Sequence, residues 1–417
     1  MKLCIIYTGG TIGCIGNPLA PMSRSDFQQA FATLISPLIK SKHTDIDIVF
    51  SHFANVLDST NIQPSDWCVI ASEIVNDYLD YDAFIVLHGT DTMAWTASAL
   101  SFLLTGLNQH GQVIAALDKP VIVTGSQLPL FTQPSSTFPL SLYDITDALN
   151  NIYGAIDAAY AGIKEVGVYF HHHLFRGNRS LKTNTHAFDA FSSPNYAFLG
   201  QHDLSFTMNS ASSHLVANRH DVALSQSQNL AALKNQLAKI SQCIDENMVI
   251  NIAAYPVFYS QQSNILAHTL SSAMSIPYVK GIILQSYGAG SFPSGSAKNA
   301  KDGLMYQALK AASEQGIVIV NCTQVITGLV NANSYEAGSW LSDVKAVDAK
   351  DMSPIAALTK LTLLLSVNQG CNYQWSPKFI GELMLTDLAG EITEANPLPS
   401  PLPQGEGAKF SLPEGES

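Results

Sequence analysis

The sequence predicts an α/β protein of two domains: a larger N-terminal domain with an open, mostly parallel sheet, and a smaller C-terminal α/β domain. Short apolar runs rich in β-branched residues alternate with amphipathic helical stretches, which is typical of parallel strands buried on both faces. This alternation is interrupted by a Ser-, Asn-, Gln- and Ala-rich stretch from Asn209 to Gln242 and then resumes. With 417 residues, 47% of them hydrophobic, the chain is long and apolar enough for more than one core.

The N-terminal series forms the catalytic domain that we expect over residues 1–208. Helices are expected where apolar residues recur at helical spacing, over Pro64–Tyr78, Met93–Leu104 and Leu142–Ala161. The expected strands are Leu3–Tyr7, Ile46–Phe50, Phe84–Leu87, Val121–Val123 and Val166–Phe170.

An interdomain connection is expected over residues 209–246, part of which, Asn229–Ile240, could form a helix. The C-terminal α/β domain follows over residues 247–393. Its expected elements are strands at Met248–Ala253, Gly281–Gln285 and Ile317–Val320, and helices near Gly303–Glu314 and Pro354–Ser366. Residues 394–417 are rich in Pro, Gly and Glu with little to bury, so we expect a disordered tail.

Composition and charge narrow the classes of partner. A formal net charge of −12 argues against a nucleic acid or an acidic membrane surface, since both require a basic patch. The apolar run after Lys2 is too short for a signal peptide, and no uncharged apolar run has membrane-spanning length. The six cysteines are scattered without a Cys-x-x-Cys pair, which is typical of free thiols. The expected location is therefore the cytoplasm.

Three predicted strands run directly into polar corners that contain glycine: TGGTIG (residues 8–13), HGTDT (88–92) and TGSQ (124–127). The carboxyl ends of parallel strands lie at one edge of an open sheet, where ligands bind, so these corners predict one convergent site. Each corner alone has a plainer interpretation. Thr90, for example, could cap the helix that begins near Thr92, with Asp91 complementing the helix dipole. TGGTIG also resembles part of a dinucleotide-binding fingerprint, but it lacks the glycine spacing and the paired acidic residue.

The residue types at these corners suit the activation of a hydroxyl group. Threonine is a weak nucleophile that needs a base or a lowered pKa. A lysine can take or pass the proton, and a carboxylate can hold that lysine in place. Lysines are scarce in the first domain, and Lys182 stands out in the stretch LFRGNRSLKTNTHAFDAF, between a strand and an aromatic segment.

These motifs resemble those of the bacterial L-asparaginases, most closely the cytoplasmic type I branch. TGGTIG, HGTDTM and RGNRSLKTN carry the resemblance, which extends over about residues 1–390 through DST (58–60), VTGSQ (123–127), QSYG (285–288) and VNCTQ (320–324). It implies an amidohydrolase that converts L-asparagine to L-aspartate and ammonia without metal or cofactor. It also implies a homodimer or homotetramer, in which the segment Ser286–Phe292 of a neighbouring subunit closes each site.

The resemblance also implies roles for the residues that match its motifs. Thr11 would be the nucleophile, Lys182 and Asp91 would shuttle the proton, and Thr90 would position or activate the water. Backbone N–H groups at the glycine corners would stabilise the oxyanion. Asp58 and Ser59 would hold the α-carboxylate and α-ammonium of the substrate. The remaining expected substrate-binding residues are Thr60, Ser126 and Ser291.

Two positions depart from the family pattern. Family members usually carry a tyrosine on a mobile loop after the first catalytic threonine, whereas here Leu19 or a neighbour takes that place. We therefore assign no lid residue to catalysis. Ser291 stands where relatives often have asparagine, which predicts weaker substrate affinity or an altered preference between asparagine and glutamine.

Two other functions fit parts of the pattern. The amidase subunit of a glutamyl-tRNA amidotransferase shares these motifs but normally has an extra N-terminal domain, whereas here the first motif begins at Thr8. A non-catalytic binding protein on an asparaginase frame would not need all the catalytic residues that the motifs retain.

His171, His172 and His173 form a run that suggests a metal site. Consecutive strand residues point to opposite faces of a sheet, so three neighbours cannot chelate one ion. We therefore expect a strand-end histidine cluster without metal.

Overall fold

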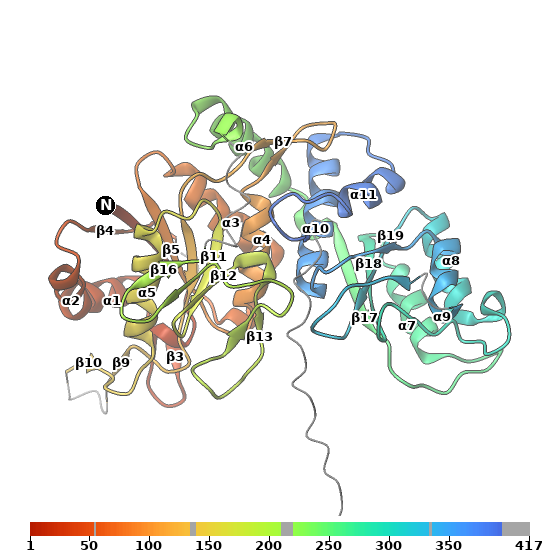
Figure 1. The fold of residues 1–417 in the computed structure, drawn as a ribbon, viewed down its shortest axis with the longest axis horizontal. Coiled ribbons are helices and arrows are strands. Elements are labelled where there is room, and N and C mark those ends of the chain that lie inside the picture. Colours follow the sequence, from red (N-terminus) through yellow and green to blue (C-terminus); the bar gives the residue numbers. More distant parts are fainter. Residues whose placement is uncertain (54–55, 134–138, 210–219, 333–335, 394–417) are drawn as a thin grey trace, which may run out of the picture.

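The computed structural model of the chain describes residues 1–53, 56–133, 139–209, 220–332 and 336–393, so the expected tail at 394–417 lies outside the described residues. The larger domain is built on an eight-stranded sheet in the order β16-β15-β12-β11-β8-β5-β1-β4 (Figure 1). From β4 to β11 the strands are parallel, and β12, β15 and β16 continue the sheet antiparallel. The prediction of an open, mostly parallel sheet is confirmed.

The strands of this sheet are β1 (Lys2–Tyr7), β4 (Asp47–Phe50), β5 (Ala83–Leu87), β8 (Val121–Thr124), β11 (Val166–Phe170), β12 (His173–Arg176), β15 (Gly200–His202) and β16 (Phe206–Met208). The helices that accompany it are α1 (Arg24–Ala30), α2 (Ser36–Lys42), α3 (Pro64–Asn76), α4 (Met93–Leu103), α5 (Ala148–Tyr160) and α6 (Ser227–Ile240).

Both faces of the sheet are covered, and the alternation along β1 shows why. Leu3 and Ile5 belong to a cluster with α1, α2 and α5, whereas Cys4 and Ile6 belong to a cluster with α3 and α4. Side chains alternate between the two faces of a strand, so a strand buried on both faces must be apolar at every position. This explains the continuous run AFIVL of β5, all of which is buried.

The smaller domain has a four-stranded parallel sheet of β17 (Met248–Ala253), β18 (Val279–Ser286), β19 (Val318–Thr323) and β20 (Val347–Asp348), in that order. Its helices are α7 (Ile265–Met274), α8 (Leu304–Glu314), α9 (Glu336–Ser339), α10 (Pro354–Cys371) and α11 (Pro377–Met384). No helix in the described part of the chain combines the length and the apolar character needed to cross a bilayer.

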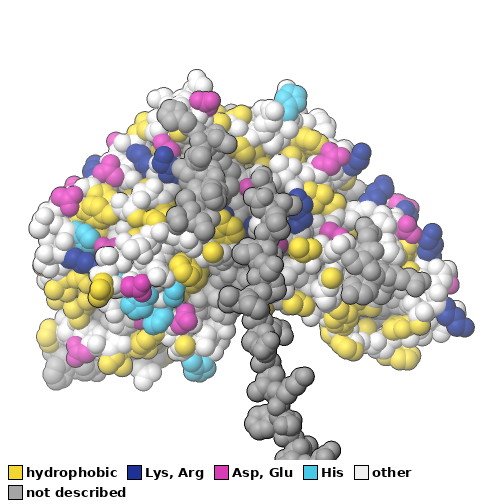
Figure 2. Space-filling model, in the orientation of Figure 1, with side chains coloured by type: hydrophobic (Ala, Val, Ile, Leu, Met, Phe, Trp, Pro, Cys, Tyr) yellow, Lys and Arg dark blue, Asp and Glu magenta, His cyan; other side chains and the backbone are white. Residues whose placement is uncertain are grey.

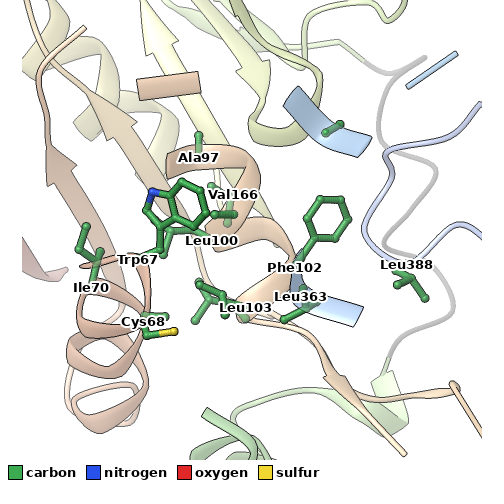
Figure 3. Close-up of a cluster of buried hydrophobic side chains, with 14 of the residues drawn as sticks. Trp67, Cys68, Ile70, Ala97, Leu100, Phe102, Leu103, Val166, Leu363 and Leu388 are labelled. Carbon is green, nitrogen blue, oxygen red and sulfur yellow. The ribbon is translucent and has the colours of Figure 1, made fainter. Parts of the chain in front are cut away.

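One of the hydrophobic clusters spans both domains. Helix α10 contacts α4 of the larger domain as well as β17, β18 and β19 of its own domain. In the close-up, Phe102 and Leu103 of α4 lie near Leu363 of α10, and Leu388 belongs to the same cluster (Figure 3). Helix α6, in the expected connection, packs on α3 and α10 and buries Leu233 within this core.

Most predicted elements are present, and the differences have local causes. Helix α5 begins at Ala148 instead of Leu142 because Leu142 pairs with Phe131 in the hairpin of β9 (Phe131–Thr132) and β10 (Ser141–Leu142). The histidine run lies at the end of a strand, as expected, but His171 and His172 are not themselves strand residues. His171 and His172 have φ of 41° and 69° and form the turn between β11 and β12. Among the described residues, no group of three His, Cys, Asp or Glu side chains is arranged to hold a metal ion.

Candidate active site

The three glycine corners lie side by side at the carboxyl edge of the larger sheet. They follow β1, β5 and β8, which are neighbours in the order β8-β5-β1. The backbone N–H of Thr8 donates to Leu87 O at 3.0 Å, and that of His88 donates to Thr124 O at 2.8 Å. The segment before Ser59 joins the same edge, since Leu57 N–H donates to Thr8 O at 2.9 Å. The convergence predicted from the strand ends is therefore present.

Two glycines bring the threonine-bearing corners into backbone contact. Gly10 has a φ of +82°, and a Cβ at Gly10 would overlap the backbone of Gly89. A Cβ at Gly89 would in turn overlap the side chain of Ser59. Only glycine allows this close approach at both positions. Thr11 and Thr90 each directly follow one of these glycines, so both threonines flank the contact, with Ser59 beside it.

Thr11 is the first residue of a short 3₁₀ helix, η1 (Thr11–Gly13), and is partly exposed. The Gly13 N–H donates to Gly10 O at 3.0 Å, which closes the turn. The Tyr7 hydroxyl lies 3.4 Å from Gly13 O and 3.3 Å from Met22 O, so it bridges the two ends of the loop between Gly13 and Met22, which contains Leu19. Burial raises the pKa of Tyr7, and its ring stacks on Phe27 at 4.0 Å between centroids. The turn that carries Thr11, the candidate nucleophile, is therefore supported by tightly packed aromatic side chains.

Thr90, Asp91 and Lys182 form one hydrogen-bonded group. The Lys182 Nζ donates to Thr90 Oγ1 at 2.8 Å and to Asp91 Oδ1 at 2.7 Å. Thr90 is 6% exposed, whereas the side chains of Lys182 and Asp91 are 18% and 60% exposed. Because the amine uses a lone pair of the Thr90 oxygen, the Thr90 proton is left to donate elsewhere. This arrangement can pass a proton between a buried hydroxyl and a carboxylate that reaches solvent.

Asp58, Ser59 and Thr60 form the turn that borders this contact. Asp58 Oδ1 accepts from the backbone N–H and from the hydroxyl of Thr60, both at 2.9 Å, and caps the 3₁₀ helix η3 (Ser59–Asn61). The Thr92 hydroxyl donates to Ser59 O at 2.7 Å, which fixes the turn to the start of α4. Burial, and then the negative charge of Asp58, raises the pKa of the Cys14 thiol to about 11. Asp58 thus contributes negative charge beside the first turn, as a site for an ammonium group requires.

Ser126 and Ser291 lie in different surroundings. Ser126 is fully buried, and its hydroxyl donates to Leu128 O at 2.5 Å. Ser291 follows β18 in the smaller domain, where its backbone exchanges hydrogen bonds with Tyr287 at 2.9 and 3.0 Å. The structure of a single chain does not bring Ser291 into the Thr90 group, so its part in a neighbouring subunit's site stays a prediction.

His88 belongs to the site although the sequence reasoning gave it no role. It is fully buried, with Nδ1 at 2.7 Å from Gly89 O and Nε2 at 2.9 Å from Thr96 Oγ1. Burial lowers the pKa of His88 to about 4, so the ring is neutral at pH 7. Its Nδ1–H donates to the peptide between Gly89 and Thr90, which fixes the peptide that carries Thr90. The available signal was a polar side chain at the end of an entirely apolar strand.

Asp147 is a second residue that the sequence did not reveal. It is 6% exposed, and its carboxylate accepts from the backbone N–H groups of Gln127 and Leu128 at 3.0 Å each and from Asn151 Nδ2 at 3.1 Å. These hydrogen bonds fix the backbone of the third corner, TGSQ (124–127), to the start of α5. The predicted helix start at Leu142 placed Asp147 inside a helix, which concealed this position at the start of α5.

Comparison with known proteins gives a consistent result for both domains. A family model described as "Asparaginase, N-terminal" matches residues 2–214, and one described as "Glutaminase/Asparaginase C-terminal domain" matches residues 259–372. L-asparaginase 1 of Escherichia coli (strain K12) is 34% identical over 392 residues, which cover 94% of this chain and 98% of that protein.

A solved structure and a less similar relative also match over nearly the whole chain. The crystal structure of L-asparaginase I from Vibrio cholerae O1 biovar eltor superposes with a TM-score of 0.67 at 31% identity, covering 94% of this chain and 99% of that one. One component of the glutamyl-tRNA(Gln) amidotransferase of Methanococcus maripaludis is 28% identical over 410 residues, covering 94% of this chain and 81% of that protein.

Proposed function

The chain belongs to the asparaginase family, and we propose that it hydrolyses L-asparagine to L-aspartate and ammonia with Thr11 as the nucleophile. The observation that carries the mechanism is the contact of Lys182 with both Thr90 and Asp91, at the point where the Gly10 and Gly89 backbones meet. A hydroxyl and a proton relay that flank one backbone contact are suited to amide hydrolysis through a covalent intermediate.

In the first half of the reaction, Thr11 Oγ1 attacks the side-chain amide carbon of asparagine. The C–O bond forms, and the carbonyl oxygen becomes an oxyanion that backbone N–H groups of the glycine corners stabilise. The C–N bond then breaks, and ammonia leaves with the proton that Thr11 lost. The product of this half-reaction is an aspartyl ester of Thr11.

In the second half, water hydrolyses this ester. Thr90 orients the water, and Lys182 with Asp91 takes up its proton as the new C–O bond forms. The ester C–O bond to Thr11 breaks, the proton returns to the Thr11 oxygen, and L-aspartate leaves. Asp58 and Ser59 hold the α-ammonium and α-carboxylate in both halves, while Thr60 supports Asp58 through its hydroxyl.

A direct assay tests these roles. Purified protein should release ammonia from L-asparagine without ATP, tRNA or added metal, and Thr11→Ala should abolish the release. Lys182→Met should lower kcat by about 10²- to 10⁴-fold, the usual contribution of a general acid–base group. Thr33→Val is the matched control. Thr33 is exposed on the helical segment that follows α1, and its hydroxyl donates only to Gln29 O of α1 among the hydrogen bonds described, so its loss should leave ammonia release unchanged. A Thr11→Ala variant with wild-type turnover would refute the nucleophile.

The same assay separates the alternatives. An amidotransferase component would depend on its partner and on tRNA, and a non-catalytic protein would release no ammonia from any amide. The amidotransferase relative is also less similar to this chain than L-asparaginase 1 of E. coli.

We further propose that a second copy of the chain closes each site through Ser286–Phe292. Apolar side chains are exposed at the carboxyl ends of β18 and β19, beside this segment: Tyr287, Val325, Ile326 and Leu329. Hydrophobic side chains also gather along the lower edge of the smaller domain in Figure 2. Light scattering should give a dimer or tetramer, and Ser291→Asn should lower the KM for asparagine or shift the preference against glutamine. Unchanged KM for both amides would discard the role of Ser291.

The cytoplasmic location stays a prediction.

A further inference from the structure

We propose that Arg179 is a positioning residue for Lys182, and that the end of the smaller domain controls the reactivity of the active site through it. This inference rests on the proposed function, because it takes Lys182 to act in catalysis. It concerns the segment Leu385–Thr393, here named the C-terminal strap, which packs against the 3₁₀ helix η4 (Gly177–Arg179), three residues before Lys182.

Lys182 lies between a strand pairing and the 3₁₀ helix η4. It lies on β13 (Leu181–Lys182), which pairs with β14 (Phe191–Ser192) in a two-stranded ribbon outside the eight-stranded sheet. The residues that follow, 183–189, are all exposed. The backbone of Lys182 is therefore held on two sides, by its pairing with the buried Phe191 and by the segment before it, which is η4.

The side chains of η4 donate to acceptors in the smaller domain. Asn178 Nδ2 donates to Ala389 O at 3.0 Å, and Arg179 Nε donates to Gly390 O at 2.8 Å. Arg179 Nη1 also donates to Asp351 Oδ2 at 2.8 Å. Asn178 and Arg179 are 1% and 4% exposed. Buried polar groups of this kind have no water to exchange with, so they hold a single geometry.

The acceptors on the other side are themselves fixed. Lys360 and Glu391 form an ion pair at 2.6 Å, and both side chains are fully buried. Lys360 Nζ also donates to Thr386 O at 2.6 Å, and Glu391 accepts from Ala389 N–H at 2.7 Å. The strap is thus folded around a buried ion pair whose remaining hydrogen bonds are satisfied, the condition under which such a pair specifies structure.

Asp351 connects Arg179 to the strap. Its carboxylate accepts from the Thr393 N–H at 3.0 Å and from the Thr393 hydroxyl at 2.5 Å. Burial alone would raise the pKa of Asp351, but the Arg179 guanidinium and the Thr393 hydrogen bonds outweigh burial and lower it. The carboxylate is therefore charged when it holds Arg179, and substituting Asp351 weakens one of the contacts that tie η4 to the smaller domain.

The consequence for the reaction is a shift of the Lys182 amine relative to Thr90. Displacing a reacting group by about 1 Å can cost about 100-fold in rate. None of the contacts described for Thr11, Asp58 or Ser59 passes through the strap. Weakening the strap should therefore lower kcat and leave the KM for asparagine nearly unchanged.

Asp351→Asn tests this with a nearly isosteric change. We expect kcat for L-asparagine to fall at least about tenfold and KM to stay within about twofold. Thr393→Val, which removes only a hydroxyl from the same network, should lower kcat in the same direction by a smaller factor. Tyr373→Phe is the matched control, because it removes another hydrogen bond between the domains, from Tyr373 OH to Leu107 O at 3.0 Å, away from η4. Its kcat should equal that of the wild type.

Three results would overturn the inference: wild-type kcat in both Asp351→Asn and Thr393→Val, an equal fall in Tyr373→Phe, or a rise in KM with kcat unchanged. If Asp351→Asn does not fold, Thr393→Val and its control decide the question. Lys182→Met separates the two levels of the argument. If Lys182→Met keeps wild-type turnover, the proposed function is refuted. If Lys182→Met loses turnover while folded Asp351→Asn keeps it, only the positioning role is refuted.

Discussion

The buried ring of His88 should make the stability of this protein sensitive to mild acid. Both ring nitrogens are engaged, at 2.7 Å from Gly89 O and 2.9 Å from Thr96 Oγ1, and the side chain is fully buried. Burial lowers the pKa of His88 from 6.5 to about 4 in the folded state. The unfolded chain therefore binds this proton first. Stability from the neutral ring is complete above about pH 6.5 and is lost as the pH falls toward 4.

The size of the effect follows from the two pKa values. A difference between 6.5 and about 4 corresponds to about 3 kcal/mol over the full range, at about 1.4 kcal/mol for each pH unit. Between pH 8 and pH 5, the linkage relation gives a loss of about 2 kcal/mol in the free energy of unfolding from His88 alone.

Urea unfolding followed by tryptophan fluorescence at pH 8 and pH 5, at one protein concentration, measures this quantity. His88→Gln should be less stable than the wild type at pH 8, because it loses ring hydrogen bonds. Its loss of stability between pH 8 and pH 5 should nevertheless be smaller than that of the wild type by about 2 kcal/mol. His110→Gln removes an exposed histidine and should keep the wild-type difference. The same difference in His88→Gln and the wild type would refute the assignment of a neutral, buried ring.

Four further variants, one of them a double substitution, have definite expected outcomes. Gly10→Ala should abolish ammonia release and lower the melting temperature, because its Cβ would overlap the Gly89 backbone at a φ of +82°. Lys360→Met should lower the free energy of unfolding in urea by about 3–5 kcal/mol, since it leaves the buried Glu391 charge without its partner. Lys360→Met combined with Glu391→Leu should recover most of that loss. Leu19→Ala should change kcat by less than about twofold in the ammonia assay, because Leu19 is 55% exposed and offers no hydroxyl to the reaction.

The sequence was sufficient where burial on both sides of a strand determines the pattern. β11 is found at Val166–Phe170 as predicted, and β1 and β5 each extend the prediction by one residue. The ends of these strands locate the corners that carry Thr11 and Thr90, because parallel strands end at a common edge. Helices α1, α2, α7 and α11 were not predicted, and neither was the antiparallel side of the sheet. Helices α1 and α2 are joined by η2 (Phe31–Ile35), and the buried Phe27, Phe31, Ile35 and Ile39 recur every four residues, so this helical periodicity was present in the sequence and was overlooked. The antiparallel strands β15 and β16 have three residues each, too few to show a clear alternation.

The sequence was not sufficient for contacts between distant buried charges. Arg179 and Asp351 are 172 residues apart, and nothing in the composition around either residue indicates a partner. The close approach of Gly10 to Gly89 also requires coordinates, because a glycine in a corner is equally compatible with an ordinary turn. For the same reason, Lys182 could be singled out from the sequence, but its 2.8 Å contact with Thr90 could not.

The two halves of the candidate site are positioned by different means. Thr11 is placed by a glycine contact inside the larger domain, so its geometry belongs to the sheet edge alone. In the positioning role that we propose, Lys182 is held in part through η4, whose side chains donate to acceptors in the smaller domain. Thr90, Asp91 and Lys182 all belong to the larger domain, so docking of the smaller domain would act on the position of the Lys182 amine and not on its presence. The positioning role that we propose therefore predicts that the larger domain by itself would keep Thr11 in place but would hold the Lys182 amine less firmly beside Thr90.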